Sequence, residues 1–140
     1  MIEIDKLFET MVEFIDYKLS NTEEDQQLEK YLNRINYLKD HCTYQISLPR
    51  RNGNSTLALK LFDKYENSIY VVSRQVKKLE TIKRSEDITT FCLFDGMLRG
   101  RRDLDLLIID ECKDLKEDVN ELIYKNLALM TNCKCIIKLG

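Results

Sequence analysis

The sequence has little of what would mark a membrane, secreted or catalytic-triad protein. No apolar run approaches the length that crosses a bilayer, and Glu3 and Asp5 stand where a secretory leader would carry basic residues. The single histidine, His41, is expected at the end of a helix or in a loop, and the residues around it match no recognised triad motif. A net charge of −2 excludes a surface that is basic throughout, although a local basic patch is compatible with it. We therefore expect a cytoplasmic protein without a membrane partner.

The 140 residues that are present suit one folded domain, because 44% are hydrophobic and 33% are charged. The five cysteines are odd in number and lie mostly in apolar runs, which favours reduced thiols inside a cell. Cys133 and Cys135 are one residue apart in a strand pattern, with no second pair and no histidine nearby. They fit buried structural cysteines better than half of a metal site.

Two helices are predicted at the start of the chain. Apolar residues recur at three- and four-residue spacing from Ile4 to Leu19 and predict an amphipathic helix over residues 1–19. A break at residues 20–23 can cap a second helix that runs to about residue 40. We expect residues 1–40 to form a helical hairpin that covers one side of the core. A coiled-coil partner site is the alternative, but the short apolar stripes favour core packing.

Strand and helix patterns alternate over residues 41–140. Strands are predicted at 44–48, 68–72, 88–94, 104–109 and 133–139, and helices at 55–66, from Ser73 through Ile82, and at 119–130, with a loop at 95–102. This alternation predicts an α/β fold, a mostly parallel sheet of about five strands with helices on both faces. The helix after Ser73 carries a basic face, which is more often solvated than bound to a phosphate backbone.

A strand, a tight polar loop and a helix start follow one another between Tyr44 and Thr56, and such a loop can hold phosphate. The usual phosphate-binding loop reads G-x-x-x-x-G-K-[ST]. The aligned stretch here is Leu48-Pro-Arg-Arg-Asn-Gly-Asn-Ser55, in which Gly53 matches the second glycine and Ser55 the magnesium ligand. A leucine therefore replaces the first glycine of the pattern.

Asn54 stands where the pattern has its lysine. An asparagine can donate a hydrogen bond, but it cannot supply the charge that steadies a transferring phosphoryl group. Arg50 or Arg51 can supply that charge from the front of the loop, and we name Arg51 as a catalytic candidate. The expected ATP-binding residues are Arg50, Arg51, Asn52, Gly53, Asn54, Ser55 and Thr56.

A second motif ends the predicted strand at 104–109. Four apolar residues, Leu106-Leu-Ile-Ile109, lead directly into Asp110 and Glu111. Such a strand delivers Asp110 to a magnesium shell shared with Ser55, and it places Glu111 to orient and activate the attacking water. A solvated strand end is the alternative explanation for two adjacent acids, but the apolar run before them argues against it.

Both motifs resemble the ATPase domain of phage large terminases and related RecA-like, helicase-like motors. The resemblance covers roughly residues 43–140 and rests on Pro49-Arg-Arg-Asn-Gly-Asn-Ser-Thr-Leu-Ala-Leu59 and on the segment from Arg99 to Glu111. It implies an ATP- and Mg²⁺-dependent motor on DNA, in the host-cell cytoplasm if the chain is viral. It also implies that the last strand lies beside the phosphate-loop strand. Arg99, Arg101 and Arg102 are candidates for DNA or phosphate contact.

Three hypotheses follow from these patterns. The first is an active terminase- or helicase-like ATPase that uses Arg50 or Arg51 in place of lysine. The second is a degenerate ATPase that keeps the fold and works by binding a nucleotide, a nucleic acid or a partner, either another protein or a second copy of itself, without turnover. The third is an unrelated α/β protein. The chain stops at Gly140, where such folds normally continue into a functional loop, so a fragment and a natural minimal version both fit.

Overall fold

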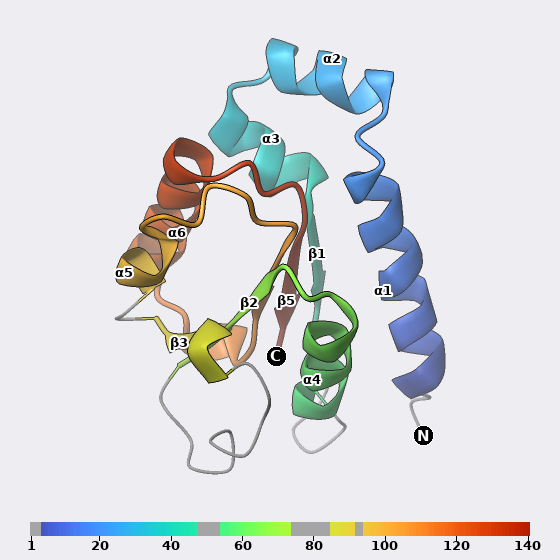
Figure 1. Cartoon of the computed structure of the whole chain (residues 1–140), viewed down its shortest axis with the longest axis vertical. Coiled ribbons are helices and arrows are strands. Elements are labelled where there is room, and N and C mark those ends of the chain that lie inside the picture. Colours follow the sequence, from blue (N-terminus) through green and yellow to red (C-terminus); the bar gives the residue numbers. More distant parts are fainter. Residues whose placement is uncertain (1–3, 48–53, 74–84, 92–93) are drawn as a thin grey trace.

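The computed structural model describes residues 4–47, 54–73, 85–91 and 94–140 (Figure 1). Two short 3-10 turns, η2 (Ser85–Asp87) and η3 (Cys112–Asp114), accompany the helices and strands. In chain order these are α1 (Ile4–Leu19), α2 (Glu23–Tyr31), α3 (Arg34–His41), β1 (Thr43–Ile46), α4 (Asn54–Lys64), β2 (Ser68–Val72), β3 (Ile88–Thr90), α5 (Phe94–Leu98), β4 (Leu106–Ile109), α6 (Glu117–Met130) and β5 (Ile136–Leu139).

The five strands form one sheet in the order β1-β5-β4-β2-β3, and every neighbouring pair is parallel. β5 lies between β1 and β4, so that Ile137 is opposite Tyr44 on one side and Ile108 on the other. The predicted α/β fold, a parallel sheet with helices on both faces, is confirmed (Figure 1). Its strand order is compatible with a RecA-like core without being specific to one.

The sheet separates two apolar cores, because successive side chains of a strand point to opposite faces. In β2, Ile69 and Val71 belong to the core beneath α3, α5 and α6, whereas Tyr70 and Val72 belong to the core beneath α1 and α4. β2, β4 and β5 are buried at every position. This explains why they read in the sequence as mostly apolar runs rather than as alternating ones, with Ser68 in β2 and Lys138 in β5 as the polar exceptions.

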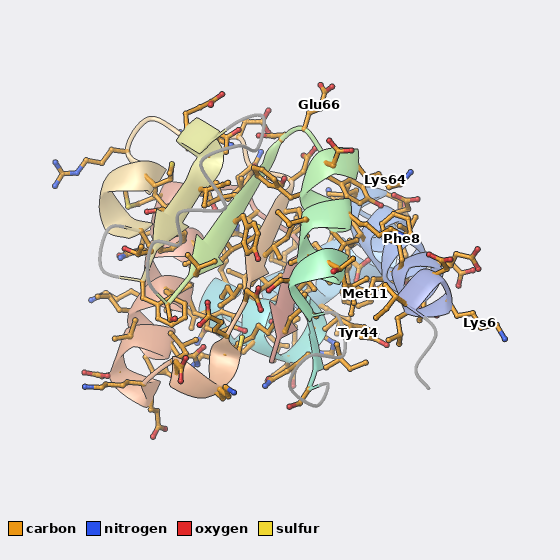
Figure 2. The ribbon with its side chains drawn as sticks, turned by 90° about the horizontal axis from the view of Figure 1, so that it is seen from below. Lys6, Phe8, Met11, Tyr44, Lys64 and Glu66 are labelled. Atoms are coloured by element: carbon orange, nitrogen blue, oxygen red, sulfur yellow. The ribbon has the colours of Figure 1, made fainter. Side chains whose placement is uncertain are left out.

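Helix α1 covers one face of the sheet beside α4. Figure 2 shows Phe8 and Met11 on the side of α1 that faces α4 and the sheet, and both belong to the apolar core on that face. The ring of Phe14 packs against that of Tyr44 in β1, with centroids 5.4 Å apart. Lys60 of α4 lies 5.3 Å from the centre of the Phe8 ring. The predicted amphipathic helix at the start of the chain is therefore a packing element of the core.

The second predicted helix is wrong in detail, because it is two helices on a different path. α2 ends at Tyr31, and the Asn33 side chain accepts a hydrogen bond from the Asn36 N–H and begins α3. α3 then buries Tyr37 and Leu38 on the face opposite α1. The N-terminal helices thus straddle the sheet, with α2 passing above the edge where the strands begin (Figure 1), instead of covering one side as a hairpin.

A second difference concerns residues 94–102, where a strand end followed by a loop was expected. Phe94 instead opens the short helix α5, and Leu98 closes it. Both side chains are almost completely buried against α6, and their four-residue spacing brings them onto one face of a helix. The strand before them ends at Thr90. The helix predicted from Ser73 through Ile82 lies, beyond Ser73 itself, outside the described residues.

Four of the cysteines lie in described segments, and all four are free thiols. Cys133 and Cys135 are completely buried, as expected of structural cysteines, and burial raises the pKa of the Cys133 thiol to about 12. Across the described ranges, no helix has both the length and the apolar character that crossing a bilayer requires.

Candidate functional site

The candidate site lies at the edge of the sheet where the parallel strands end. α4 starts after β1, and Ser55 stands in its first turn. Asp110 and Glu111 directly follow β4, Ser73 follows β2, and Gly140 follows β5. In open parallel sheets ligands bind at this edge, because the loops there converge and helix N-termini point toward it.

Asp110 is the centre of the site. Its side chain is only 2% exposed, and its Oδ2 accepts two hydrogen bonds, one from Ser55 Oγ at 3.0 Å and one from the Tyr70 hydroxyl at 2.7 Å. Oδ1 accepts a hydrogen bond from the Glu111 N–H at 2.8 Å. The Asp110 N–H donates to the carbonyl of Val71 at 2.9 Å, which continues the β2–β4 pairing by one residue. Three donors therefore fix one orientation of this carboxylate.

Ser55 and Asp110 together suit a hard divalent cation. A serine hydroxyl has one proton to donate and two lone pairs. Because the proton is directed to Asp110, the lone pairs remain for a cation. Within the described ranges, no group of three or more His, Cys, Asp or Glu side chains could hold a metal by itself. Magnesium does not need such a group, since it usually takes one or two protein oxygens together with phosphate and water oxygens.

Glu111 has an unusual backbone conformation. Its φ of 56° and ψ of 40° lie in the left-handed region, which costs an L-residue free energy. Its Oε2 accepts a hydrogen bond of 2.7 Å from Ser73 Oγ. The turn also passes close to Gly140, where a Cβ would lie 3.2 Å from Glu111 Cα, so only glycine fits there without a shift. The strained turn directs Glu111 away from the path of β4, beside the ends of β2 and β5.

Lys138, near the end of β5, is a buried cation close to this edge. Its Nζ donates to Asn120 Oδ1 at 2.7 Å and lies 5.3 Å from the centre of the Tyr124 ring. Both partners belong to α6, on the face opposite α4. Burial lowers the pKa of Lys138. Lys138 is therefore held on the α6 side and does not replace the missing lysine at Asn54.

The predicted site residues are only partly described. The structure brings Ser55 and Asp110 into contact and places Glu111 next to them. Asn54 is the first residue of α4, and Thr56 is exposed in the same turn. Arg50, Arg51, Asn52 and Gly53 lie outside the described residues.

Two residues of the site were missed by sequence reasoning, Tyr70 and Ser73. Both belong to or follow β2, which reads in the sequence only as a buried strand. The available signal was a tyrosine hydroxyl in an otherwise apolar, β-branched run, since a buried hydroxyl needs a partner. Its partner could not be named, because the pairing of β2 with β4 depends on the strand order.

The arginines after α5 differ from one another in their surroundings. Arg101 donates to Asp87 Oδ1 at 2.6 Å and forms an ion pair with it, whereas Arg99 and Arg102 are exposed. Arg101 thus ties the end of α5 to η2. Only Arg99 and Arg102 present their side chains to solvent for a phosphate contact.

A polar pocket of about 410 Å³ lies at the opposite edge of the sheet, near the end of α6. Arg34 lines it and donates to the carbonyls of Ala128, Thr131 and Cys133, which caps the end of the helix. Glu29 accepts hydrogen bonds from both Arg34 and Lys134. Glu29, Arg34 and Lys134 pair with one another, so these three residues form a structural network rather than a second candidate site, and Arg102 also lines the pocket.

No protein-family model, curated protein or solved structure gives a significant match to this chain. The functional conclusion therefore depends on the geometry at the carboxyl edge of the sheet.

Proposed function

We propose that this chain is a nucleotide-binding domain of the P-loop NTPase class, which binds ATP with Mg²⁺ and acts as the ATPase domain of a terminase- or helicase-like DNA motor. The observation that carries the proposal is the 3.0 Å hydrogen bond between Ser55 Oγ and Asp110 Oδ2. It joins the first turn of the helix after β1 to the end of the strand that carries the acidic pair. A hydroxyl and a carboxylate in these two places are what Mg²⁺–nucleotide binding requires.

In this proposal each residue has a separate task. Ser55 Oγ and the Asp110 carboxylate hold Mg²⁺, which when bound neutralises charge on the phosphate oxygens. The N-terminus of α4 presents backbone N–H groups to the phosphates. Glu111 orients a water molecule and accepts its proton on a carboxylate oxygen. Ser73, which donates to Glu111 Oε2, fixes the direction of that carboxylate.

A binding module without turnover is the second candidate, and Asn54 favours it. Asn54 opens α4 at the position of the usual lysine and brings no positive charge to the phosphates. Turnover then depends on Arg50 or Arg51. If neither arginine serves, the same Ser55–Asp110 pair still binds a nucleotide or a partner without hydrolysing ATP.

The decisive experiment measures ATP binding by calorimetry and phosphate release with Mg²⁺. It compares the unaltered chain with Glu111→Gln, Arg51→Ala and Asn54→Lys, and uses Asp63→Ala, at an exposed position near the other end of α4, as a control. For an active enzyme we expect Glu111→Gln to abolish phosphate release and to retain ATP binding. Arg51→Ala should reduce release by about 100-fold or more, as loss of a charge-stabilising group does.

The other outcomes separate the alternatives. ATP binding without phosphate release, together with release gained in Asn54→Lys, supports the non-hydrolysing module. No ATP binding by the chain or by Asn54→Lys overturns the P-loop proposal.

Addition of double-stranded DNA tests whether the domain acts as a DNA motor. Stimulated release that is lost in an Arg99→Ala, Arg102→Ala double variant supports DNA coupling, whereas no stimulation removes DNA from the proposal.

A further inference from the structure

Among the described side chains of the candidate site, only that of Tyr70 comes from the interior of a strand. It is 1% exposed, yet its hydroxyl lies 2.7 Å from Asp110 Oδ2. The ring packs against Phe62 of α4, with centroids 5.9 Å apart. Its backbone is held by β4, where Ile108 is the register partner of Tyr70. The hydroxyl is therefore presented to Asp110 from a rigid position.

A tyrosine that only fills the core can direct its hydroxyl to the surface or to any neighbouring polar group. Tyr65, on the same face, reaches the exposed Asp16 at 2.8 Å in that way. The Tyr70 hydroxyl instead meets a carboxylate that is itself 2% exposed. Removing one donor from such a buried carboxylate leaves it poorly solvated, so this hydrogen bond is worth more than one at the surface.

The Tyr70 hydroxyl is suited to donate a permanent hydrogen bond to Asp110. A tyrosine hydroxyl ordinarily titrates only at about pH 10, and Asp110 Oδ2 lies within hydrogen-bond distance of this one. It therefore keeps its proton over the whole physiological pH range. A hydroxyl that always donates to Oδ2 differs from Ser55, whose oxygen must also serve the cation. Tyr70 can hold Asp110 in place while Ser55 adjusts to a ligand.

We propose that Tyr70 is a positioning residue, which holds the Asp110 carboxylate in the orientation that receives a divalent cation bound to a nucleoside triphosphate. This inference rests on the proposed function, because it assigns a role within the same site. It adds one claim to that function. The metal-dependent part of the nucleotide affinity depends on the Tyr70 hydroxyl, which touches neither the metal nor the nucleotide.

The test compares the Kd for ATP in Mg²⁺ with the Kd for ATP in EDTA, by calorimetry. Their ratio is the gain that the metal contributes. We expect Tyr70→Phe to reduce this gain by about 10-fold, the lower range for loss of a group that orients a metal ligand, and to leave the Kd in EDTA within about twofold. Tyr65→Phe is the matched control, because it removes a tyrosine–carboxylate hydrogen bond away from the site and should leave both Kd values unchanged.

The outcomes distinguish this inference from the proposed function. An unaltered chain that binds no ATP under either condition overturns both. An unaltered chain that shows a metal-dependent gain, retained in full by Tyr70→Phe, overturns the role of Tyr70 and leaves the nucleotide site standing. A loss of affinity in Tyr70→Phe that is equal in EDTA and in Mg²⁺ also overturns it, because it signals a structural effect.

A second measurement does not depend on the folding of a variant. The chain is labelled with ¹³C at the tyrosine ζ carbon, and its spectrum is recorded with ATP in EDTA and with ATP in Mg²⁺. We expect the Tyr70 resonance to shift only when the metal is present, while that of Tyr65 stays in place. A Tyr70 resonance that does not respond to the metal contradicts the proposal.

Discussion

Ser55 Oγ donates a hydrogen bond to Asp110 Oδ2 across 3.0 Å, although the two residues are 55 positions apart in the chain. The bond links the N-terminus of α4 to the end of β4, two elements that meet only because β5 closes the sheet between β1 and β4. Loss of the Ser55 hydroxyl should therefore affect the binding of a metal at Asp110.

Replacement of Ser55 should separate metal binding from nucleotide binding. We expect Ser55→Ala to weaken ATP binding in Mg²⁺ by about 10-fold or more, since it removes a ligand oxygen and a donor to Asp110. Binding in EDTA should change little. Ser55→Thr keeps the hydroxyl and should retain most of the affinity in calorimetry. Equal Kd values for Ser55→Ala and the unaltered chain would contradict a cation between Ser55 and Asp110.

The left-handed backbone of Glu111 predicts that glycine is more stable than alanine at this position. With φ at 56°, glycine is favoured over any other residue at this position. We expect Glu111→Gly to be more stable than Glu111→Ala by about 1 kcal/mol in urea unfolding, because both variants lose the carboxylate and only alanine keeps the strain. The matched pair Glu66→Gly and Glu66→Ala, outside this turn, should not show that order. An alanine variant of Glu111 as stable as the glycine variant would refute the strained turn.

The buried ion pair between Lys18 and Asp25 predicts a loss of stability in acid. Lys18 Nζ lies 3.1 Å from Asp25 Oδ1, and both residues are buried. Burial alone would raise the pKa of Asp25, but the hydrogen bonds from Lys18 and Thr22 and the charge of Lys18 outweigh it and hold the pKa below its ordinary value. A carboxyl with a lowered pKa in the folded state stabilises the protein above its unfolded pKa of about 4. That stabilisation is lost as the pH falls through the folded value.

We therefore expect Asp25→Asn to lower the free energy of unfolding at neutral pH by about 3 kcal/mol, because it leaves Lys18 buried without its partner. The difference from the unaltered chain should shrink as the pH falls below about 4. Urea unfolding at several pH values measures it. Asp5→Asn breaks an ion pair with Lys60 that is exposed and screened by solvent, so its pH-dependent effect should have the same sign and be much smaller. A difference that stays constant from neutral to acid pH would show that Asp25 does not titrate in this window.

The cap on α6 predicts that arginine cannot be exchanged for lysine at position 34. The Arg34 guanidinium donates to three backbone carbonyls and to Glu29 at once. A lysine ammonium lacks the planar fork that makes this possible. Arg34→Lys should lower the free energy of unfolding by about 2 kcal/mol, the usual cost of leaving buried acceptors unpaired. Arg102→Lys at the exposed surface nearby is the control. Two variants of equal stability would argue against the cap.

Sequence patterns predicted correctly the elements in which residue propensity and apolar spacing favour the same structure. β2 was placed at Ser68–Val72 without error, because a β-branched run stands between turn-forming residues. α5 was missed, because Asp95 and Gly96 oppose a helix and only the burial of Phe94 and Leu98 decides it. The break at Asn33 was missed for the opposite reason, since the apolar spacing continues across it and hides an N-cap.

Sequence reasoning identified the site residues that belong to the two motifs, but it did not identify those contributed by β2. Ser55, Asp110 and Glu111 were chosen for their residue types and spacing, which can be read directly from the sequence. Tyr70 and Ser73 become part of the site only when β2 pairs with β4. That pairing follows from strand order, and no local pattern in the chain specifies it.

The place of β5 between β1 and β4 constrains the order in which the sheet can form. β5 contributes residues 136–139, later in the chain than every other strand, yet it pairs on both sides, with β1 and with β4. Among the described strands β1 pairs with β5 alone, so before residues 136–139 are synthesised β1 has no neighbour there. The helices on either side of it in the chain, α3 and α4, then lack part of the surface that they cover. We therefore expect the described sheet to close only when β5 inserts, and partly folded chains to associate more readily before that step.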